Sequence, residues 1–80
     1  MALHSLVTLN NRIVIQDIDS GELFAFFLVE PDRHDAKTGK ISISTSLGAA
    51  LIGKSTGTVV AWQAPSRIRR FEVRSVSQSS

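Results

Sequence analysis

Cysteine is absent from the 80 residues of this chain, and aromatic residues make up only 6% of it. Without cysteine the chain can form neither a disulfide framework nor a zinc site of the cysteine type. The longest uninterrupted apolar run, residues 23–29, is far shorter than the roughly 18 residues that suggest a membrane span. The first nine residues have no basic region and no sustained apolar core, so they do not resemble a secretory signal. We therefore expect a cytoplasmic protein that makes no contact with membranes.

Size and composition predict one globular domain over residues 1–80, in which the polar residues 77–80 form a frayed tail. The chain is 42% hydrophobic and 20% charged, as in ordinary soluble proteins. A chain of this length buries only about 60 to 65% of its unfolded surface, so its margin of stability is thin. Its formal net charge of +2 is uneven, because residues 66–80 carry four Arg against one Glu.

The stretch from residue 40 to residue 60 is the most informative, because its apolar period changes from that of a strand to that of a helix. Isoleucine and serine alternate at residues 41–44, which predicts a half-buried strand. The next apolar residues follow one helical face and predict a helix over residues 47–52: Leu47, Ala50 and Leu51. Thr45 or Ser46 can cap its start and Gly53 can end it. Helices below about 12 residues are marginal in water, so this one must lie on a sheet.

The rest of the chain supplies that sheet. Further strands are predicted where β-branched or apolar runs are bounded by turn residues, at 6–9, 12–18, 23–29, 58–62 and 67–76. Because residues 23–29 are all apolar, they predict a central strand covered on both faces. Residues 31–39 predict a loop with room for a turn of helix. In the last strand Phe71 and Val73 share a face, opposite Arg70 and Arg74. The sum is an α+β domain, a mostly antiparallel sheet with one short helix on its concave face.

Several linked blocks of this sequence resemble the C-terminal domain of the Gre-type transcription elongation factors. The central blocks are Gly39-Lys40-Ile41-Ser42-Ile43, Leu47-Gly48-x-Ala50-Leu51-Ile52-Gly53-Lys54 and Gly57. The outer blocks are Asp17-x-Asp19-Ser20-Gly21-Glu22, Leu28-Val29, Asp35 and the run from Pro65 through Phe71 and Val73 to Val76. The resemblance therefore covers about residues 7–76. Trp62, three residues before Pro65, is more similar to the small regulator of nucleoside diphosphate kinase, a relative that shares this domain.

This resemblance implies an FKBP-like fold and docking on RNA polymerase near its secondary channel, with modulation of transcription elongation. In Gre factors an N-terminal coiled coil enters that channel, and acidic residues at its tip hold metal for transcript cleavage. We expect a stand-alone docking module without the coiled coil, which does not stimulate cleavage. The module is then non-enzymatic and uses no cofactor and no metal.

Two departures from the family pattern bear on docking. The family contacts the polymerase through an Asp-Ser-Pro type segment just before the helix, where this chain has three hydroxyl residues and lacks both the carboxylate and the proline. Ser66-Arg67 also stands where the family commonly has a glycine pair. We place the candidate partner contacts before and at the helix start and in the last strand: Ser44, Thr45, Ser46, Leu47, Arg67, Arg69, Arg70 and Arg74.

The four arginines of the last strand support an alternative function. Arginine binds phosphates and carboxylates through bidentate contacts, so this cluster could serve a module that binds nucleic acid or an acidic protein. The competing interpretation is a solvated sheet edge that its charge keeps from aggregating. No exposed aromatic residues are interleaved with the arginines, so stacking on single-stranded bases is not supported.

Residues 48–55 formally match the phosphate-binding pattern G-x-x-x-x-G-K-[ST]. In that motif a helix follows the loop, whereas here the intervening residues favour a helix and a glycine turn and strand come next. We interpret the match as a helix, its glycine cap and a surface lysine, Lys54. His4 and His34 have no His or Cys at ligand spacing, so we expect both at the surface and no metal site.

Prolyl isomerase is the third alternative, since an FKBP-like fold invites it. Such activity needs an aromatic pocket, for which the candidates are Phe24, Phe26, Phe27, Trp62 and Phe71. In so small a core we expect most of these rings to serve as packing, because each buries a large area. A G-x-S-x-G elbow is also missing, which argues against a hydrolase. We therefore expect no small-molecule substrate.

Overall fold

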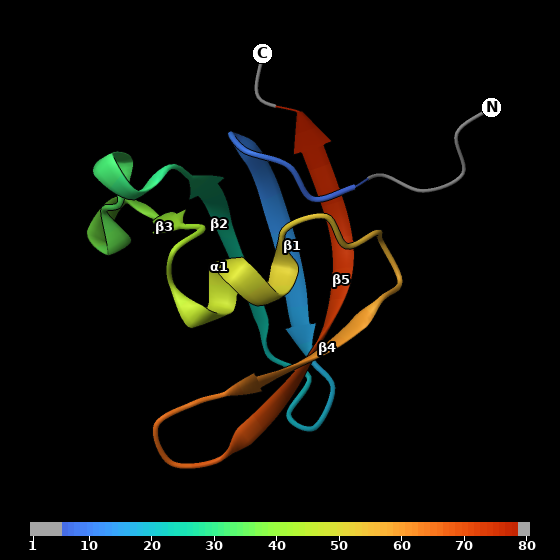
Figure 1. Ribbon diagram of the computed structural model, residues 1–80. Coiled ribbons are helices and arrows are strands. Elements are labelled where there is room, and N and C mark those ends of the chain that lie inside the picture. Colours follow the sequence, from blue (N-terminus) through green and yellow to red (C-terminus); the bar gives the residue numbers. More distant parts are fainter. Residues whose placement is uncertain (1–5, 79–80) are drawn as a thin grey trace, which may run out of the picture.

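The computed structural model describes residues 6–78, which form five strands and one α-helix (Figure 1). The strands are β1 (Asn11–Asp17), β2 (Leu23–Val29), β3 (Lys40–Ser42), β4 (Val59–Gln63) and β5 (Ile68–Gln78). The helix is α1 (Ser46–Leu51), and two short 3₁₀ turns precede β3, at Pro31–Arg33 and Ala36–Thr38. The loop predicted over residues 31–39 thus contains two helical turns. His4 lies outside the described residues.

The five strands form one sheet in the order β3-β2-β1-β5-β4, in which all neighbours are antiparallel except β2 and β3. β2 lies inside the sheet, between β3 and β1, but the prediction that both of its faces are covered is wrong. Within the described part of the chain, α1 covers only one face of the sheet, and Leu23 on the other face of β2 is 60% exposed. A run of apolar residues favours a strand, but it does not show that both faces of the strand are covered.

β5 ends two residues beyond the predicted strand. Residues 77 and 78, predicted as part of a polar tail, pair with Arg12 and Asn11 of the central strand. The polar character of this end is compatible with a strand because one face of the sheet is exposed. A register shift between Val14 and Ile15 bends the β1–β5 pair, which adds to the curl of the sheet.

Residues 6–9, predicted as a strand, do not form one. Leu6 makes a single isolated bridge with Ser55, and Val7 joins the chain after α1 through backbone hydrogen bonds to Gly53 and Lys54, each 2.8 Å long. Val7 itself is fully buried. The segment therefore acts as a strap beside the helix end, and Asn10, at φ +67°, turns the chain into β1.

The helix α1 begins and ends one residue earlier than predicted, and its cap at Thr45 and its end at Gly53 are as expected. The Thr45 hydroxyl accepts from the amide of Gly48 at 3.0 Å, which caps the first turn. Gly53, at φ +80°, takes the left-handed conformation that ends the helix. Leu51 is fully buried against the concave face of the sheet. Gly48 faces the same way, and it lies so close to the backbone of Ser42 that a side chain there would overlap the carbonyl oxygen.

The hydrophobic core lies between α1 and the concave face. Its buried members come from the strap, the helix and four strands: Val7, Ile13, Ile15, Phe26, Leu28, Leu51, Val60, Phe71 and Val73. Alternation along β5 places Phe71 and Val73 in this core and Arg70 and Arg74 on the opposite face, as predicted.

Candidate partner-binding site

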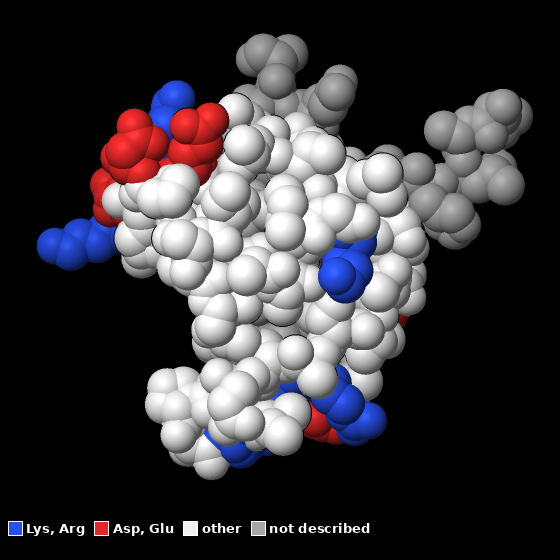
Figure 2. All heavy atoms as spheres, in the orientation of Figure 1, with Lys and Arg blue, Asp and Glu red and all other residues white. Residues whose placement is uncertain are grey.

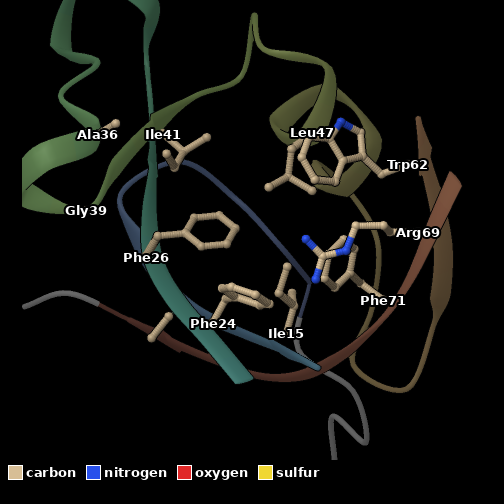
Figure 3. A pocket seen from close by; sticks show the side chains of 11 residues that line it. Ile15, Phe24, Phe26, Ala36, Gly39, Ile41, Leu47, Trp62, Arg69 and Phe71 are labelled. Atoms are coloured by element: carbon tan, nitrogen blue, oxygen red, sulfur yellow. The ribbon is translucent and has the colours of Figure 1, made fainter. Parts of the chain in front are cut away.

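An open pocket of about 340 Å³ lies on the concave face, beside the start of α1 (Figure 3). We call it the aromatic pocket. Its walls come from β1, β2, β3, α1, β4 and β5, and its principal side chains are Ile15, Phe24, Phe26, Ile41, Leu47, Trp62, Arg69 and Phe71. The pocket exists because α1 has six residues and is therefore only about 9 Å long, too short to fill the curled sheet.

The aromatic residues have a larger role than packing. Phe26 and Phe71 are buried in the core and also line the pocket, while Phe24 and Trp62 are half-buried at its walls. The Phe24 and Phe71 rings meet edge to face, with centroids 5.9 Å apart. Phe27 alternates with Phe26 along β2 and lies on the other face of the sheet. Most of these rings serve as packing, as expected, and four of the five also line the aromatic pocket.

The rim of the pocket is fixed by a bond between β4 and the helix. The indole Nε1 of Trp62 donates to the hydroxyl of Ser46, the first helical residue, at 2.7 Å. The Trp62 ring also lies against Phe71, with centroids 6.0 Å apart. Leu47, the next residue of the helix, is half-buried and lines the pocket. The helix start thus forms one wall of the pocket.

A buried ion pair forms the polar end of the pocket. Nε and Nη2 of Arg69 donate to Oδ2 of Asp17 at 2.9 and 2.7 Å, and the two side chains are 22% and 1% exposed. The Arg69 guanidinium lies over two rings, 5.1 Å from the Phe71 centroid and 5.5 Å from the Phe24 centroid. The hydrogen bond from Arg69, followed by the bond from the Asp19 amide, lowers the pKa of Asp17. Asp17 is therefore ionised near neutral pH and holds Arg69 in place.

The four arginines do not form one basic surface. Arg69 faces the aromatic pocket, whereas Arg70 lies on the opposite face and pairs with Asp19 at 2.7 Å. Arg74, on the same face as Arg70, lies 3.4 Å from Glu72, and Arg67 is exposed. The cause is the alternation of side chains along a strand. Basic and acidic atoms accordingly lie side by side at the lower edge of the molecule in Figure 2, near the β1–β2 turn.

The hydroxyl residues before the helix mainly hold the loop itself. The Ser42 Oγ accepts from the amide of Ser44 at 2.9 Å, and the Thr45 hydroxyl donates to the Ser42 carbonyl at 2.6 Å. His34, exposed as predicted, accepts from the Ser42 amide through Nδ1 at 3.0 Å. Of the predicted contacts, the structure brings Ser46, Leu47 and Arg69 together at the pocket. It places the remaining ones in the loop or on other surfaces.

The phosphate-loop match has the geometry of a capped helix. Gly48 lies inside α1, and after Ser55 the chain makes a turn at Gly57 and enters β4. Among residues 6–78 no group of three or more His, Cys, Asp or Glu is arranged to hold a metal ion. Asp17 and Ile15 were missed as site residues, because only the register between β1 and β5 brings them to the pocket.

The family model described as transcription elongation factor, GreA/GreB, C-term, matches residues 3–78. The chain belongs to this family. GreA of Thermodesulfovibrio yellowstonii is 42% identical over 71 residues, which cover 89% of this chain and 45% of that protein. GreA of Ralstonia nicotianae is 44% identical over 64 residues, which cover 80% of this chain and 40% of that protein.

Solved structures of GreA/GreB proteins share the fold. The GreA/GreB factor from Nitrosomonas europaea superposes with a TM-score of 0.78 at 32% identity, covering 90% of this chain and 60% of that one. GreA factor homolog 1 of Thermus thermophilus gives a TM-score of 0.82 at 26% identity, covering 94% and 50%. The match confirms the predicted family and a mostly β domain with one short helix.

The chain spans about half the length of the curated relatives it matches. The GreA/GreB C-terminal domain is a non-catalytic binding domain, which confirms the prediction that this one is not an enzyme. Over residues 6–78, none of the helices is long and apolar enough to cross a membrane.

Proposed function

We propose that this domain docks on RNA polymerase near the secondary channel and thereby modulates transcription elongation. Membership of the GreA/GreB family supports the kind of partner, since the relatives named above are transcription elongation factors. The curled sheet with a helix across its concave face also supports the FKBP-like interpretation of the fold. Tested alone, residues 1–80 should bind without stimulating transcript cleavage.

The observation that carries the docking proposal is the aromatic pocket at the helix start. Anchor residues of protein interfaces insert into well-packed apolar pockets, and such anchors contribute most of the binding free energy. The volume of about 340 Å³ lies at the small end of the range for ligand pockets, which leaves room for a side chain and the backbone beside it. Leu47 and Ser46 at the rim belong to the region where the family resemblance places the polymerase contact. We therefore assign the aromatic pocket as the docking surface.

Two leucine substitutions test this assignment, one in the aromatic pocket and one on the opposite face of the sheet. Leu47→Ala removes a wall of the pocket, whereas Leu23→Ala changes an exposed leucine on the opposite face of the sheet. In a titration of labelled polymerase we expect Leu47→Ala to weaken binding at least about fivefold, since truncation of an interface anchor costs more than 1 kcal/mol. Leu23→Ala should leave it unchanged. The proposal would be contradicted if both substitutions changed the polymerase affinity equally. It would also be contradicted if the folded wild-type domain did not bind polymerase at tens of micromolar.

The alternative of a nucleic-acid or acidic-protein module is less well supported by the geometry. Three of the four arginines are paired with carboxylates, and they point to both faces of β5. A continuous basic surface, which phosphate binding needs, is therefore not formed by them. Salt-dependent binding of nucleic acid in the absence of polymerase would favour this alternative over docking.

A further inference from the structure

The aromatic pocket contains one cationic side chain, Arg69, and its position is fixed. Figure 3 shows the guanidinium group projecting into the pocket from β5, among apolar side chains. Arginine carries five N–H donors, of which Asp17 takes one on Nε and one on Nη2. Within residues 6–78 this guanidinium donates no other hydrogen bond. The pocket therefore offers free N–H donors at its polar end.

The charge around these donors determines which acceptor fits. Asp17 is ionised and fully buried, so its negative charge offsets that of Arg69 at 2.7 Å. Glu22, which is mostly exposed, adds a further negative charge 3.9 Å from Nη2. A carboxylate entering the pocket would lose its hydration without meeting a net positive charge, which is unfavourable. A neutral carbonyl oxygen can accept from the same N–H groups at a smaller desolvation cost.

We propose that the aromatic pocket binds one apolar side chain together with the neutral backbone carbonyl beside it, as an exposed turn of a partner protein presents them. Arg69 then supplies the N–H donors, and the negative charge of Asp17 makes the pocket favour a neutral acceptor over a carboxylate. The partner's identity rests on the proposed function. The chemistry of the pocket can be measured without the polymerase.

Two small probe molecules with the same leucine side chain show whether the pocket prefers a neutral carbonyl or a carboxylate. N-acetyl-L-leucine methylamide is neutral, whereas N-acetyl-L-leucine carries a carboxylate at pH 7. Fragments of this size bind at about millimolar affinity or weaker, which NMR titration of ¹⁵N-labelled protein can measure. We expect the methylamide to bind about tenfold more tightly than the carboxylate, because the anion lies near two negative side chains. The signals that shift should include the indole N–H of Trp62.

Variants of Arg69 and Asp17 test which residue supplies the hydrogen-bond donors and which sets the preference for the neutral probe. Arg69→Met removes the N–H donors and should weaken binding of the methylamide at least about fivefold, because a hydrogen bond is lost, whereas Arg12→Met, a matched change on the exposed face of β1, should leave that binding unchanged. Asp17→Asn leaves Arg69 with an uncompensated charge and should reverse the preference in favour of the carboxylate. Thermal melting checks that each variant is folded.

Several outcomes would overturn the proposal. Equal affinity of wild type for the two probes, or a preference for the carboxylate, does so without any variant, as does binding of neither probe at tens of millimolar. Unchanged methylamide affinity in folded Arg69→Met, or an unchanged preference in folded Asp17→Asn, does so as well. These results leave the docking proposal standing if polymerase still binds. Conversely, the expected probe preference without polymerase binding supports the pocket chemistry and directs the search to another partner.

Discussion

Replacing Gly48 by alanine is expected to destabilise the domain, although alanine favours a helix more than glycine does. Helix propensity alone predicts a gain of about 1 kcal/mol. The new methyl group, however, would overlap the carbonyl oxygen of Ser42 and lie 3.0 Å from the Cα of Ile43. Both neighbours are backbone, so no rotamer change can relieve the contact. The helix must move away from the loop that precedes it.

The expected change in the free energy of unfolding combines two unfavourable contributions with one favourable one. Overpacking in a well-packed site costs about 1 to 3 kcal/mol. A displaced helix start also weakens the Thr45 cap, which contributes about 1 kcal/mol. After the propensity gain is subtracted, we expect a net loss of about 1 to 3 kcal/mol. For a domain of this size each kcal/mol lowers Tm by about 4 to 8 °C.

The assay is urea and thermal unfolding followed by circular dichroism, with Ala49→Gly as the matched control. Ala49 is exposed in the same helix, so this change tests propensity without packing and should cost about 1 kcal/mol. If Gly48→Ala is as stable as wild type or more stable, α1 does not approach the loop as closely as described.

Three further substitutions test the core, the ion pair and the docking loop. Leu51→Ala should lower the free energy of unfolding by about 2 to 5 kcal/mol, since Leu51 is fully buried; a loss below about half a kcal/mol in urea melts would show that α1 packs elsewhere. Because the pKa of Asp17 is lowered, its contribution to stability should be present above about pH 4 and decline as pH falls further; a Tm gap between wild type and Asp17→Asn that stays constant from pH 6 to pH 2 would refute this linkage. Ser44→Asp should tighten polymerase binding by up to about 1.5 to 3 kcal/mol by restoring the family carboxylate, with Ser46 retained because it accepts from Trp62; unchanged affinity in the same titration would exclude that contact.

Local features of this fold could be predicted from the sequence. The cap at Thr45, the spacing of Leu47 and Leu51 and the left-handed Gly53 are decided within a few residues of one another. The turn between β1 and β2 is equally local, because Asp17 accepts from the amides of Asp19 and Ser20. Interactions of this range leave a clear pattern in the chain.

Features that depend on distant partners could not be predicted. Asp17 and Arg69 are 52 residues apart, and their pairing follows from the register and bulge between β1 and β5. The exposed face of β2 depends on where α1 packs, and the apolar content of β2 does not predict this. The aromatic residues of the candidate site were identified, but the space between them depends on the curl of the sheet. Trp62 reaches Ser46 only through that tertiary arrangement.

The central claim is that the domain docks on polymerase through the aromatic pocket at the start of α1. Site-specific crosslinking tests this claim most directly. Because the chain contains no cysteine, single cysteines at Ser44 and at Ser77 can each carry a benzophenone label. Ser44 is exposed in the loop before α1, whereas Ser77 is exposed at the far end of β5, beside Arg12. We predict crosslinks to polymerase from residue 44 that excess unlabelled domain suppresses, and none from residue 77. Crosslinking from residue 77 alone, or equally from both positions, would contradict the account.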